Sequence, residues 1–197
     1  MKYQCILLGL VLLPFFGRAQ NPSLPESPKD ISPLLIGERI PAVSLKDAMG
    51  RPFSFAEHIS EKPTVIVFYR GGWCPFCTRQ LAGLQEVLPD LQATGYQLWA
   101  VSTDAPEGLK ASAEQNNLDY VLLSDADFTA AKLFGIAFKA PENYQDMVPI
   151  LPVPAVFVVD KKGMIRFEYI NPDFKQRLDA GLLLAVTKQL QADLSQH

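Results

Sequence analysis

Cysteine and histidine are scarce in this chain of 197 residues, which contains three cysteines and two histidines. A structural zinc site takes about four ligands, and Cys5, His58 and His197 form no ligand-like cluster with the other two cysteines. The sequence therefore predicts no metal site. It also has no glycine-rich phosphate-binding loop, so we expect no cofactor. His58 falls in a polar stretch and is expected at the surface.

Basic residues are not in excess either. The chain carries 18 Lys and Arg against 21 Asp and Glu, which gives a formal net charge of −3 and a pI of about 5.4. Domains that bind nucleic acid usually carry a basic patch or stripe, so no nucleic-acid partner is expected. Internal repeats are absent as well. At this length we predict one domain that is large enough for its own core.

Long apolar runs are limited to one, near the amino terminus. Residues 5–16 are apolar apart from Gly9, follow Lys2, and precede the small residues of Gly17-Arg18-Ala19. The run is shorter than the 20 or so residues of a membrane span, and its flanks are typical of a cleavable signal. We therefore predict a signal peptide at 1–19 and an exported, periplasmic protein. An uncleaved anchor is the alternative.

The next segment, residues 20–33, has the composition of a linker. Four prolines occur there with Ser, Glu and Lys, and such segments usually act as extended spacers. We expect a mobile Pro-rich linker at 20–33, followed by a single folded domain at 34–197.

One stretch, residues 64–84, dominates the prediction of function. It reads TVIVFYRGGWCPFCTRQLAGL. Its first residues form a short apolar run after Pro63, which is typical of a fully buried strand. The strand is expected to end near Tyr69, and Gly71 and Gly72 then predict a turn.

Two cysteines stand where the following helix is expected to begin. The helix is indicated by leucines three and four residues apart, at 81, 84 and 88. Cys74 is then expected at the N-cap, Pro75 at the first helical position and Cys77 in the first turn. A thiolate is the reactive form of cysteine, and a helix N-terminus stabilises that anion. We predict a redox pair that closes a reducible disulfide; a zinc-bound pair and a purely structural disulfide are the alternatives.

The remaining residues predict an α/β fold in which strands alternate with helices. Single strands are expected at 97–102 and 120–123, and two hairpins are expected to pair 43–45 with 52–55 and 155–159 with 164–169. Residues 139–151 are expected to be irregular, as a lid or variable insertion.

Further helices are expected before and after residues 139–151. One covers 106–115 with Asp104 or Thr103 as its cap, and Pro89 is expected to kink or restart the cysteine helix. A short helix ends near residue 134, and a last helix covers 174–194 with four apolar side chains turned inward: Leu178, Leu182, Leu183 and Val186.

Five segments together resemble the alkyl hydroperoxide reductase and thiol-specific antioxidant (AhpC/TSA) family, the peroxiredoxins, over roughly residues 34–186. They are IGERIPAVSLKDAMGRPFSF, VIVFYRGGWCPFC, VSTDAPEGLKASAEQNN, LLSDADFTAAKLFGI and PAVFVVDKKGMIRF. The pairing of FYRGxWCPxC with LPVPAxxVxDxxGxI resembles the branch called peroxiredoxin-like. The resemblance implies a thioredoxin-like fold, with a central mixed β-sheet flanked by helices and an N-terminal β-hairpin extension.

The same resemblance implies an activity. It is that of a thiol-dependent peroxidase, which reduces hydroperoxides through a CxxC thiol and disulfide cycle. A dithiol reductant such as a thioredoxin-like protein would reopen the disulfide, and oligomers are common in the family. Two registers are open. The peroxiredoxin motif Pro-x-x-x-Thr-x-x-Cys places Cys77 at the attacking position, whereas the thioredoxin motif Trp-Cys-x-x-Cys places Cys74 there.

Two family groups that polarise the peroxide bond are missing here. The threonine position of the motif holds Cys74, and Pro154 stands where peroxiredoxins usually carry an arginine. Arg70 or Arg79 is a candidate replacement for that arginine. By its likeness to thioredoxins, Pro154 is expected to follow a cis peptide bond and to bind substrate together with Trp73; a trans proline at an edge strand is the alternative.

Two other functions compete with the peroxidase. One is a thioredoxin-like protein disulfide reductase of the exported compartment, in which Cys74 attacks and Cys77 releases the mixed disulfide. The other is a non-enzymatic thiol sensor, in which the disulfide changes the affinity for a partner without turnover.

Overall fold

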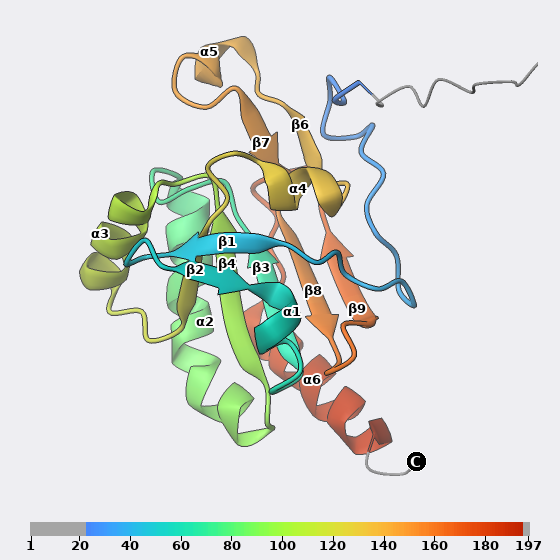
Figure 1. Ribbon diagram of the computed structural model, residues 1–197. Coiled ribbons are helices and arrows are strands. Elements are labelled where there is room, and N and C mark those ends of the chain that lie inside the picture. Colours follow the sequence, from blue (N-terminus) through green and yellow to red (C-terminus); the bar gives the residue numbers. More distant parts are fainter. Residues whose placement is uncertain (1–22, 195–197) are drawn as a thin grey trace, which may run out of the picture.

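A computed structural model describes residues 23–194 of the protein (Figure 1), so the predicted signal peptide lies outside the described residues. The main sheet has seven strands in the order β2-β1-β5-β4-β3-β8-β9. Their bounds are β1 Ser44–Asp47, β2 Pro52–Ser54, β3 Thr64–Phe68, β4 Gln97–Ser102, β5 Val121–Ser124, β8 Ala155–Val159 and β9 Ile165–Ile170. The strands β3, β4 and β5 are parallel, and the other pairs are antiparallel. The predicted mixed sheet and both predicted hairpins are confirmed.

Helices cover both faces of this sheet. Their bounds are α1 Phe55–His58, α2 Pro75–Ala93, α3 Pro106–Asn116, α4 Thr129–Leu133, α5 Glu142–Gln145 and α6 Ala180–Leu194. Figure 1 shows α2 and α6 behind the sheet, with α1 and α4 in front of it. Within residues 23–194, no helix has both the length and the apolar composition that crossing a membrane requires.

The central strand β3 explains why both faces must be covered. All five of its residues are buried, because Val65 and Val67 pack under α2 and α6 while Ile66 and Phe68 pack on the opposite side. A continuous apolar run is the expected pattern for a parallel strand buried on both faces. The residues that follow β3 are therefore presented from a rigid support.

The segment 139–151 is more regular than expected. Its two ends lie in a two-stranded sheet of β6, Ala137–Lys139, and β7, Ile150–Pro152, and α5 lies between the strands. The prediction that the whole segment is irregular is wrong, and Leu151 and Val148 are buried in a small core of their own. This hairpin projects at the top of Figure 1.

Residues 23–33 are packed on the domain, unlike the mobile spacer that their composition suggests. Leu24 and Ile31 pack against the main core, and the carbonyl of Pro25 accepts a hydrogen bond of 2.8 Å from the N–H of Lys139. Apolar side chains among the prolines therefore anchor this segment.

The helices depart from prediction at two places. The last helix begins at Ala180 rather than at 174, and Leu182, expected inward, is 54% exposed. The Asp179 side chain accepts from the N–H of Leu182, so the chain is capped there and the helix starts late. In α2, Pro89 does not restart the helix, which runs through to Ala93.

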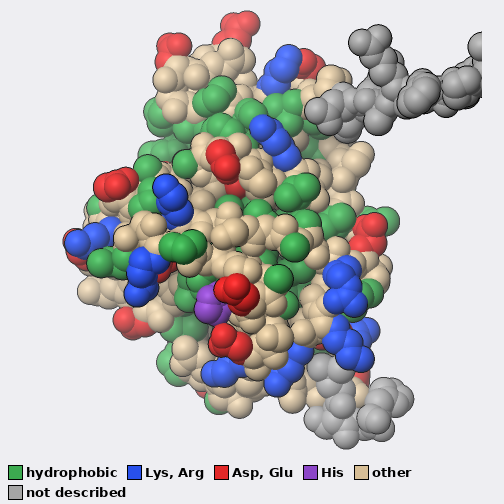
Figure 2. Space-filling model, viewed as in Figure 1, with side chains coloured by type: hydrophobic (Ala, Val, Ile, Leu, Met, Phe, Trp, Pro, Cys, Tyr) green, Lys and Arg blue, Asp and Glu red, His purple; other side chains and the backbone are tan. Residues whose placement is uncertain are grey.

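The surface mixes charges of both signs. Figure 2 shows acidic and basic side chains interspersed on the face turned to the viewer. His58 lies at the surface as predicted, stacked on Phe53 with 4.1 Å between ring centroids and 3.1 Å from a carboxylate oxygen of Glu61.

Candidate active site

The cysteine turn joins the end of β3 to the start of α2, as the sequence predicts. Cys74 is the N-cap residue in an extended conformation, Pro75 opens the helix, and Cys77 lies in its first turn. The carbonyl of Cys74 accepts hydrogen bonds from the N–H groups of Cys77, at 2.9 Å, and Thr78, at 3.1 Å. Among the described residues no side chain caps this helix end, so its positive dipole end faces the Cys74 sulfur.

Gly71 allows the turn to close. Its φ is +151°, and a Cβ there would lie 2.3 Å from Trp73 Nε1 and 2.9 Å from an oxygen of Asp104. Neither distance is possible for a real side chain. Gly72 next to it donates its N–H to Asp104 Oδ2 at 2.8 Å. The turn is therefore held from the loop after β4.

This use of Asp104 corrects a prediction. Asp104 and Thr103 were expected to cap α3, but the N-cap of that helix is Ala105, without a side-chain bond. Thr103 Oγ1 donates instead to the carbonyl of Arg70 at 2.9 Å. Because β3 and β4 are parallel, their carboxyl ends meet at one edge, and the polar groups after β4 bind the cysteine turn. Residues 62–85 contain no Asp or Glu, so Asp104 brings a carboxylate to the cysteine turn from outside that stretch.

The two sulfurs are free thiols with unequal electrostatics. Cys74 is 1% exposed and Cys77 0%. A hydrogen bond from the Cys77 thiol lowers the pKa of Cys74 well below its ordinary value. Burial raises this pKa, but the Cys77 N–H, Arg70 and Arg177 lower it further. The same hydrogen bond, burial and the negative charge of Cys74 raise the pKa of Cys77. Cys74 is therefore the thiolate of the pair.

Arg70 lies beside the cysteines in an aromatic cage. It is 4% exposed, and its guanidinium carbon is 4.8, 4.7 and 4.3 Å from the ring centroids of Trp73, Tyr144 and Phe174. Each such contact contributes about 0.5–2 kcal/mol. The predicted site residues Arg70 and Trp73 are thus brought together. Arg79, the other candidate, is exposed, with its guanidinium over the ring of Phe76 at 5.8 Å.

A second arginine reaches the sulfurs from the far end of the chain. Arg177 Nη2 donates to Cys77 Sγ at 3.4 Å. The sequence did not predict this contact, because Arg177 stands 100 residues from Cys77 and no local pattern connects the two. Arg177 and Arg70 therefore give the site two cations. Arg177 comes from outside the cysteine motif.

Pro154 lies at the site but does not take the predicted conformation. Phe68 of β3 pairs with Ala155, so Pro154 lies next to the start of the cysteine turn. Its peptide bond is trans, since residues 23–194 contain no cis bond. The N–H of Val153, which lies between β7 and β8, donates to the carbonyl of Ile136 at 2.8 Å. That N–H is therefore not free to pair with a substrate strand, and β8 is a central strand rather than an edge strand.

A small apolar cavity of about 110 Å³ lies beside Arg70. Its lining includes Pro154, Tyr144 and Phe174. The buried polar atoms near the cysteines that lack a hydrogen-bond partner within residues 23–194 include Arg70 Nε, Trp73 Nε1 and Arg177 Nε. Because buried donors are normally paired, these groups are suited to receive a small polar reactant.

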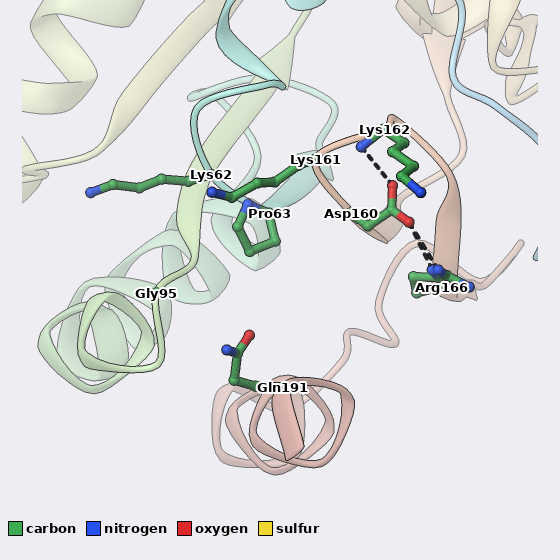
Figure 3. Close-up of a pocket in the computed structure, with 8 residues that line it drawn as sticks. All are labelled: Lys62, Pro63, Gly95, Asp160, Lys161, Lys162, Arg166 and Gln191. Atoms are coloured by element: carbon green, nitrogen blue, oxygen red, sulfur yellow. Dashed lines mark hydrogen bonds and ion pairs between the residues drawn. The ribbon is translucent and has the colours of Figure 1, made fainter. Parts of the chain in front are cut away.

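A larger cavity, of about 440 Å³, lies at the opposite end of the sheet. Figure 3 shows its lining, which includes Lys62 and Pro63 just before β3 and contains no cysteine. Within it, Asp160 bonds the side chain of Arg166 at 3.0 Å and the N–H of Lys162 at 2.8 Å. Its size alone does not make it the active site, because it lacks a nucleophile. In the described part of the chain, no three His, Cys, Asp or Glu side chains are grouped as a metal site requires.

Curated proteins of similar sequence carry the name peroxiredoxin. The chloroplastic peroxiredoxin Q of Sedum lineare is 30% identical over 135 residues, which cover 68% of this chain and 68% of that protein. Peroxiredoxin Bcp of Escherichia coli is 30% identical over 149 residues, which cover 74% and 90%.

Solved structures give the same fold. Peroxidoxin BcpB of Mycobacterium tuberculosis superposes with a TM-score of 0.67 at 23% identity, covering 79% of this chain and 97% of that one. AhpC of Enterococcus faecalis gives 0.69 at 22%, covering 83% and 95%. The predicted thioredoxin-like fold is confirmed. The sequence profile of the AhpC/TSA family matches residues 36–168, more than half of the chain, and this protein therefore belongs to that family, as its motifs predict.

Proposed function

We propose that the protein is a thiol-dependent peroxidase in which Cys74 attacks the hydroperoxide and Cys77 resolves the product. The observation that carries the assignment is the position of Cys74 at the open start of α2, with a lowered pKa. A thiolate at neutral pH is the form that reacts with a peroxide.

The reaction takes two steps. The Cys74 thiolate attacks one peroxide oxygen, so that an S–O bond forms, the O–O bond breaks, and the alcohol or water leaves. Cys77 then attacks the sulfur of the resulting sulfenic acid, forming the Cys74–Cys77 disulfide and releasing water. Two thiols are oxidised and one peroxide is reduced. An external dithiol reductant, such as a thioredoxin-like protein, reopens the disulfide.

The assignment of Cys74 departs from the family register. By the peroxiredoxin motif, Cys77 stands at the attacking position. In the reduced protein, however, the interaction between the two side chains lowers the pKa of Cys74 and raises that of Cys77, and Cys74 is the cysteine at the N-cap of α2. Electrostatics therefore favours Cys74 over the position given by the motif.

The reduced site suits a small substrate better than a protein disulfide. Both sulfurs are buried, so a bulky disulfide cannot contact them without a movement of the turn. The backbone N–H of Val153, where a thioredoxin-type substrate would pair, is already bonded to Ile136. Both observations favour the peroxidase over the disulfide reductase. Export to the periplasm, predicted from residues 1–19, is part of the proposal.

The test is stopped-flow reaction of hydrogen peroxide with the reduced protein and its single variants. We expect Cys77→Ser to react once and stop as a sulfenic acid that dimedone traps, and Cys74→Ser not to react. The reverse pattern would overturn the assignment of Cys74. If the reduced wild type consumed peroxide no faster than a free thiol, the peroxidase itself would be excluded. Insulin reduction no faster than with dithiothreitol alone would count against the reductase.

A further inference from the structure

The second step of the cycle needs a nucleophile that the reduced site does not provide. Cys77 must lose its proton before it attacks the sulfenic acid, because the thiolate is the nucleophile in disulfide formation. In the reduced protein the hydrogen bond to Cys74, burial and the charge of Cys74 all oppose that ionisation. Some group must stabilise Cys77 once Cys74 has been oxidised.

Arg177 is positioned to do this. Its Nη2 lies 3.4 Å from Cys77 Sγ and donates to it. Among residues 23–194, no carboxylate pairs with its guanidinium, and its Nε is buried without a partner there. The adjacent Leu178 is buried in the core under α2 and α6, which fixes where the side chain of Arg177 begins. The charge of Arg177 is therefore available to the sulfur rather than neutralised elsewhere.

The two arginines of the site differ in their contact with the sulfurs. Arg70 favours the charged form of Cys74, whereas Arg177 favours the charged form of both cysteines and contacts Cys77 directly. Arg70 is held among three rings, and Arg177 stands on the segment before α6. Of the two guanidinium groups, that of Arg177 is therefore the one in direct contact with the resolving sulfur.

We propose, resting on the peroxidase function above, that Arg177 is a catalytic residue of the resolving step and holds Cys77 as a thiolate after the proton of Cys77 has left with the first product. When the O–O bond breaks, the leaving oxygen takes the proton from the Cys77 thiol. Cys74 becomes a neutral sulfenic acid, so the anion that opposed ionisation of Cys77 is gone. Arg177 then faces the only remaining negative charge of the pair. The Cys77 thiolate attacks Cys74, the S–S bond forms, and hydroxide leaves as water after protonation by solvent.

The direct test separates the two steps in Arg177→Gln and Arg177→Lys. Sulfenic acid formation is measured by rapid quenching with dimedone, and disulfide formation by thiol counting after a single equivalent of hydrogen peroxide. A hydrogen bond to a charged group contributes about 1.5–3 kcal/mol, which corresponds to roughly 10- to 100-fold in rate. We expect Arg177→Gln to slow disulfide formation by that factor and sulfenic acid formation by less than about threefold. Arg177→Lys is expected to recover part of the loss.

Arg79→Gln is the matched control. It removes a nearby arginine that is exposed and lies over Phe76 instead of contacting a sulfur, and it is expected to leave both steps unchanged. If Arg177→Gln formed the disulfide as fast as the wild type, the inference would be wrong. Equal slowing of resolution by Arg79→Gln would contradict it as well, since the effect would then not depend on contact with Cys77.

A second measurement does not depend on peroxidase activity. In a Cys74→Ser background, the rate of iodoacetamide reaction with Cys77 is followed against pH, with and without Arg177→Gln. We expect the midpoint to move to higher pH by about one to two units when Arg177 is removed. An unchanged midpoint contradicts the role of Arg177 whether or not the wild type reduces peroxide. If the midpoint moves but the wild type does not reduce peroxide, the proposed function fails while the contact between Arg177 and Cys77 stands.

Discussion

At the carboxyl end of β3, buried donors such as Arg70 Nε, Trp73 Nε1 and Arg177 Nε have no hydrogen-bond partner among the described residues. At the amino end of the same strand, the carboxylate that lines the cavity shown in Figure 3 is paired. Asp160 there accepts bonds from the N–H groups of Lys162 and Met164 and from the side chain of Arg166. One strand thus carries buried donors without partners at one end and a hydrogen-bonded carboxylate at the other.

The difference shows where the protein keeps groups that lower its folding stability but can bind a reactant. An unpaired buried donor costs about 1–3 kcal/mol, and such groups persist where the surrounding structure holds them in place. Around the cysteines, Asp104 and Gly71 supply that support through the turn. The opposite end has exposed lysines and a paired carboxylate around its cavity, which is the pattern of a solvated surface. Unpaired buried donors therefore distinguish the cysteine end from the opposite end of the strand.

The largest expected effect is the difference in alkylation rate between the two cysteine sulfurs. Because its pKa is lowered, Cys74 is a thiolate at every pH above that lowered pKa. This includes the pH range below about 8.5 in which a free thiol is mostly protonated. Its alkylation by iodoacetamide should be level through neutral pH and fall as the pH drops through the lowered pKa. Cys77, with its raised pKa, should react roughly 100-fold more slowly at pH 7. Mass spectrometry of the alkylated cysteines measures both.

The control for this profile is Cys77→Ala, which removes the thiol donor to Cys74. The pKa of Cys74 should then rise toward the free value, since the largest stabilising interaction is lost. A profile of Cys74 that is unchanged in this variant would show that the helix end, not Cys77, holds the anion.

Removing the cation from the aromatic cage should give the next largest effect. Arg70→Met keeps an apolar side chain among the three rings but deletes the positive charge beside Cys74. We expect the reaction with hydrogen peroxide to slow by roughly 10- to 100-fold, because charge that develops at the reacting oxygens loses a preorganised donor. Stopped-flow measurement at several pH values separates a change in the thiolate fraction from a change in its reactivity. If Arg70→Met and the wild type reacted with hydrogen peroxide at equal rates, Arg70 would have no part in the reaction.

A pair of glycine variants compares the two ends directly. Gly71→Ala places a Cβ 2.3 Å from Trp73 Nε1 in the cysteine turn, whereas Gly163→Ala, near the opposite cavity, meets Ile40 at 3.4 Å. Both glycines have positive φ, so Gly163→Ala should lose about 1–3 kcal/mol of stability, and Gly71→Ala should lose more because its Cβ also overlaps Trp73 and Asp104. Only Gly71→Ala should also lose peroxidase activity. Denaturant unfolding and peroxide consumption on the same samples test this, and a matching loss of activity in Gly163→Ala would refute the contrast.

The strand, the turn and the start of the helix were predictable because their causes are local. The apolar run before Tyr69, the glycines after it and Pro75 each act on their own neighbours, and the positions of Cys74 and Cys77 at the helix start followed from them. The remaining strands and helices were predicted from the same kind of local pattern, and the family resemblance added the thioredoxin-like fold.

The missing parts of the site depend on contacts between distant residues. An Asp two positions before Pro106 is typical of a helix cap, and only the parallel pairing of β3 with β4 assigns Asp104 to the cysteine turn. That pairing was itself predictable, so Asp104 could have been found by asking which residues follow adjacent parallel strands. Arg177 and the rings of Tyr144 and Phe174 give no such signal, since they lie on irregular segments or on the short helix α5. The trans bond before Pro154 depends on β7 and on Ile136, which were not foreseen.

The smallest effect is expected at the opposite end, where the comparison is most easily broken. Arg166 pairs with Asp160 at 3.0 Å, but its side chain is 48% exposed, and exposed ion pairs contribute about 0–1 kcal/mol. The free energy of unfolding of Arg166→Gln should therefore lie within about 1 kcal/mol of the wild-type value, and the variant should consume peroxide at the wild-type rate. High salt should shrink the difference further, because it screens an exposed pair. A loss of peroxidase activity in this variant would mean that the lysine-lined cavity is coupled to the cysteines through β3, and the two ends would then have to be treated as one functional unit.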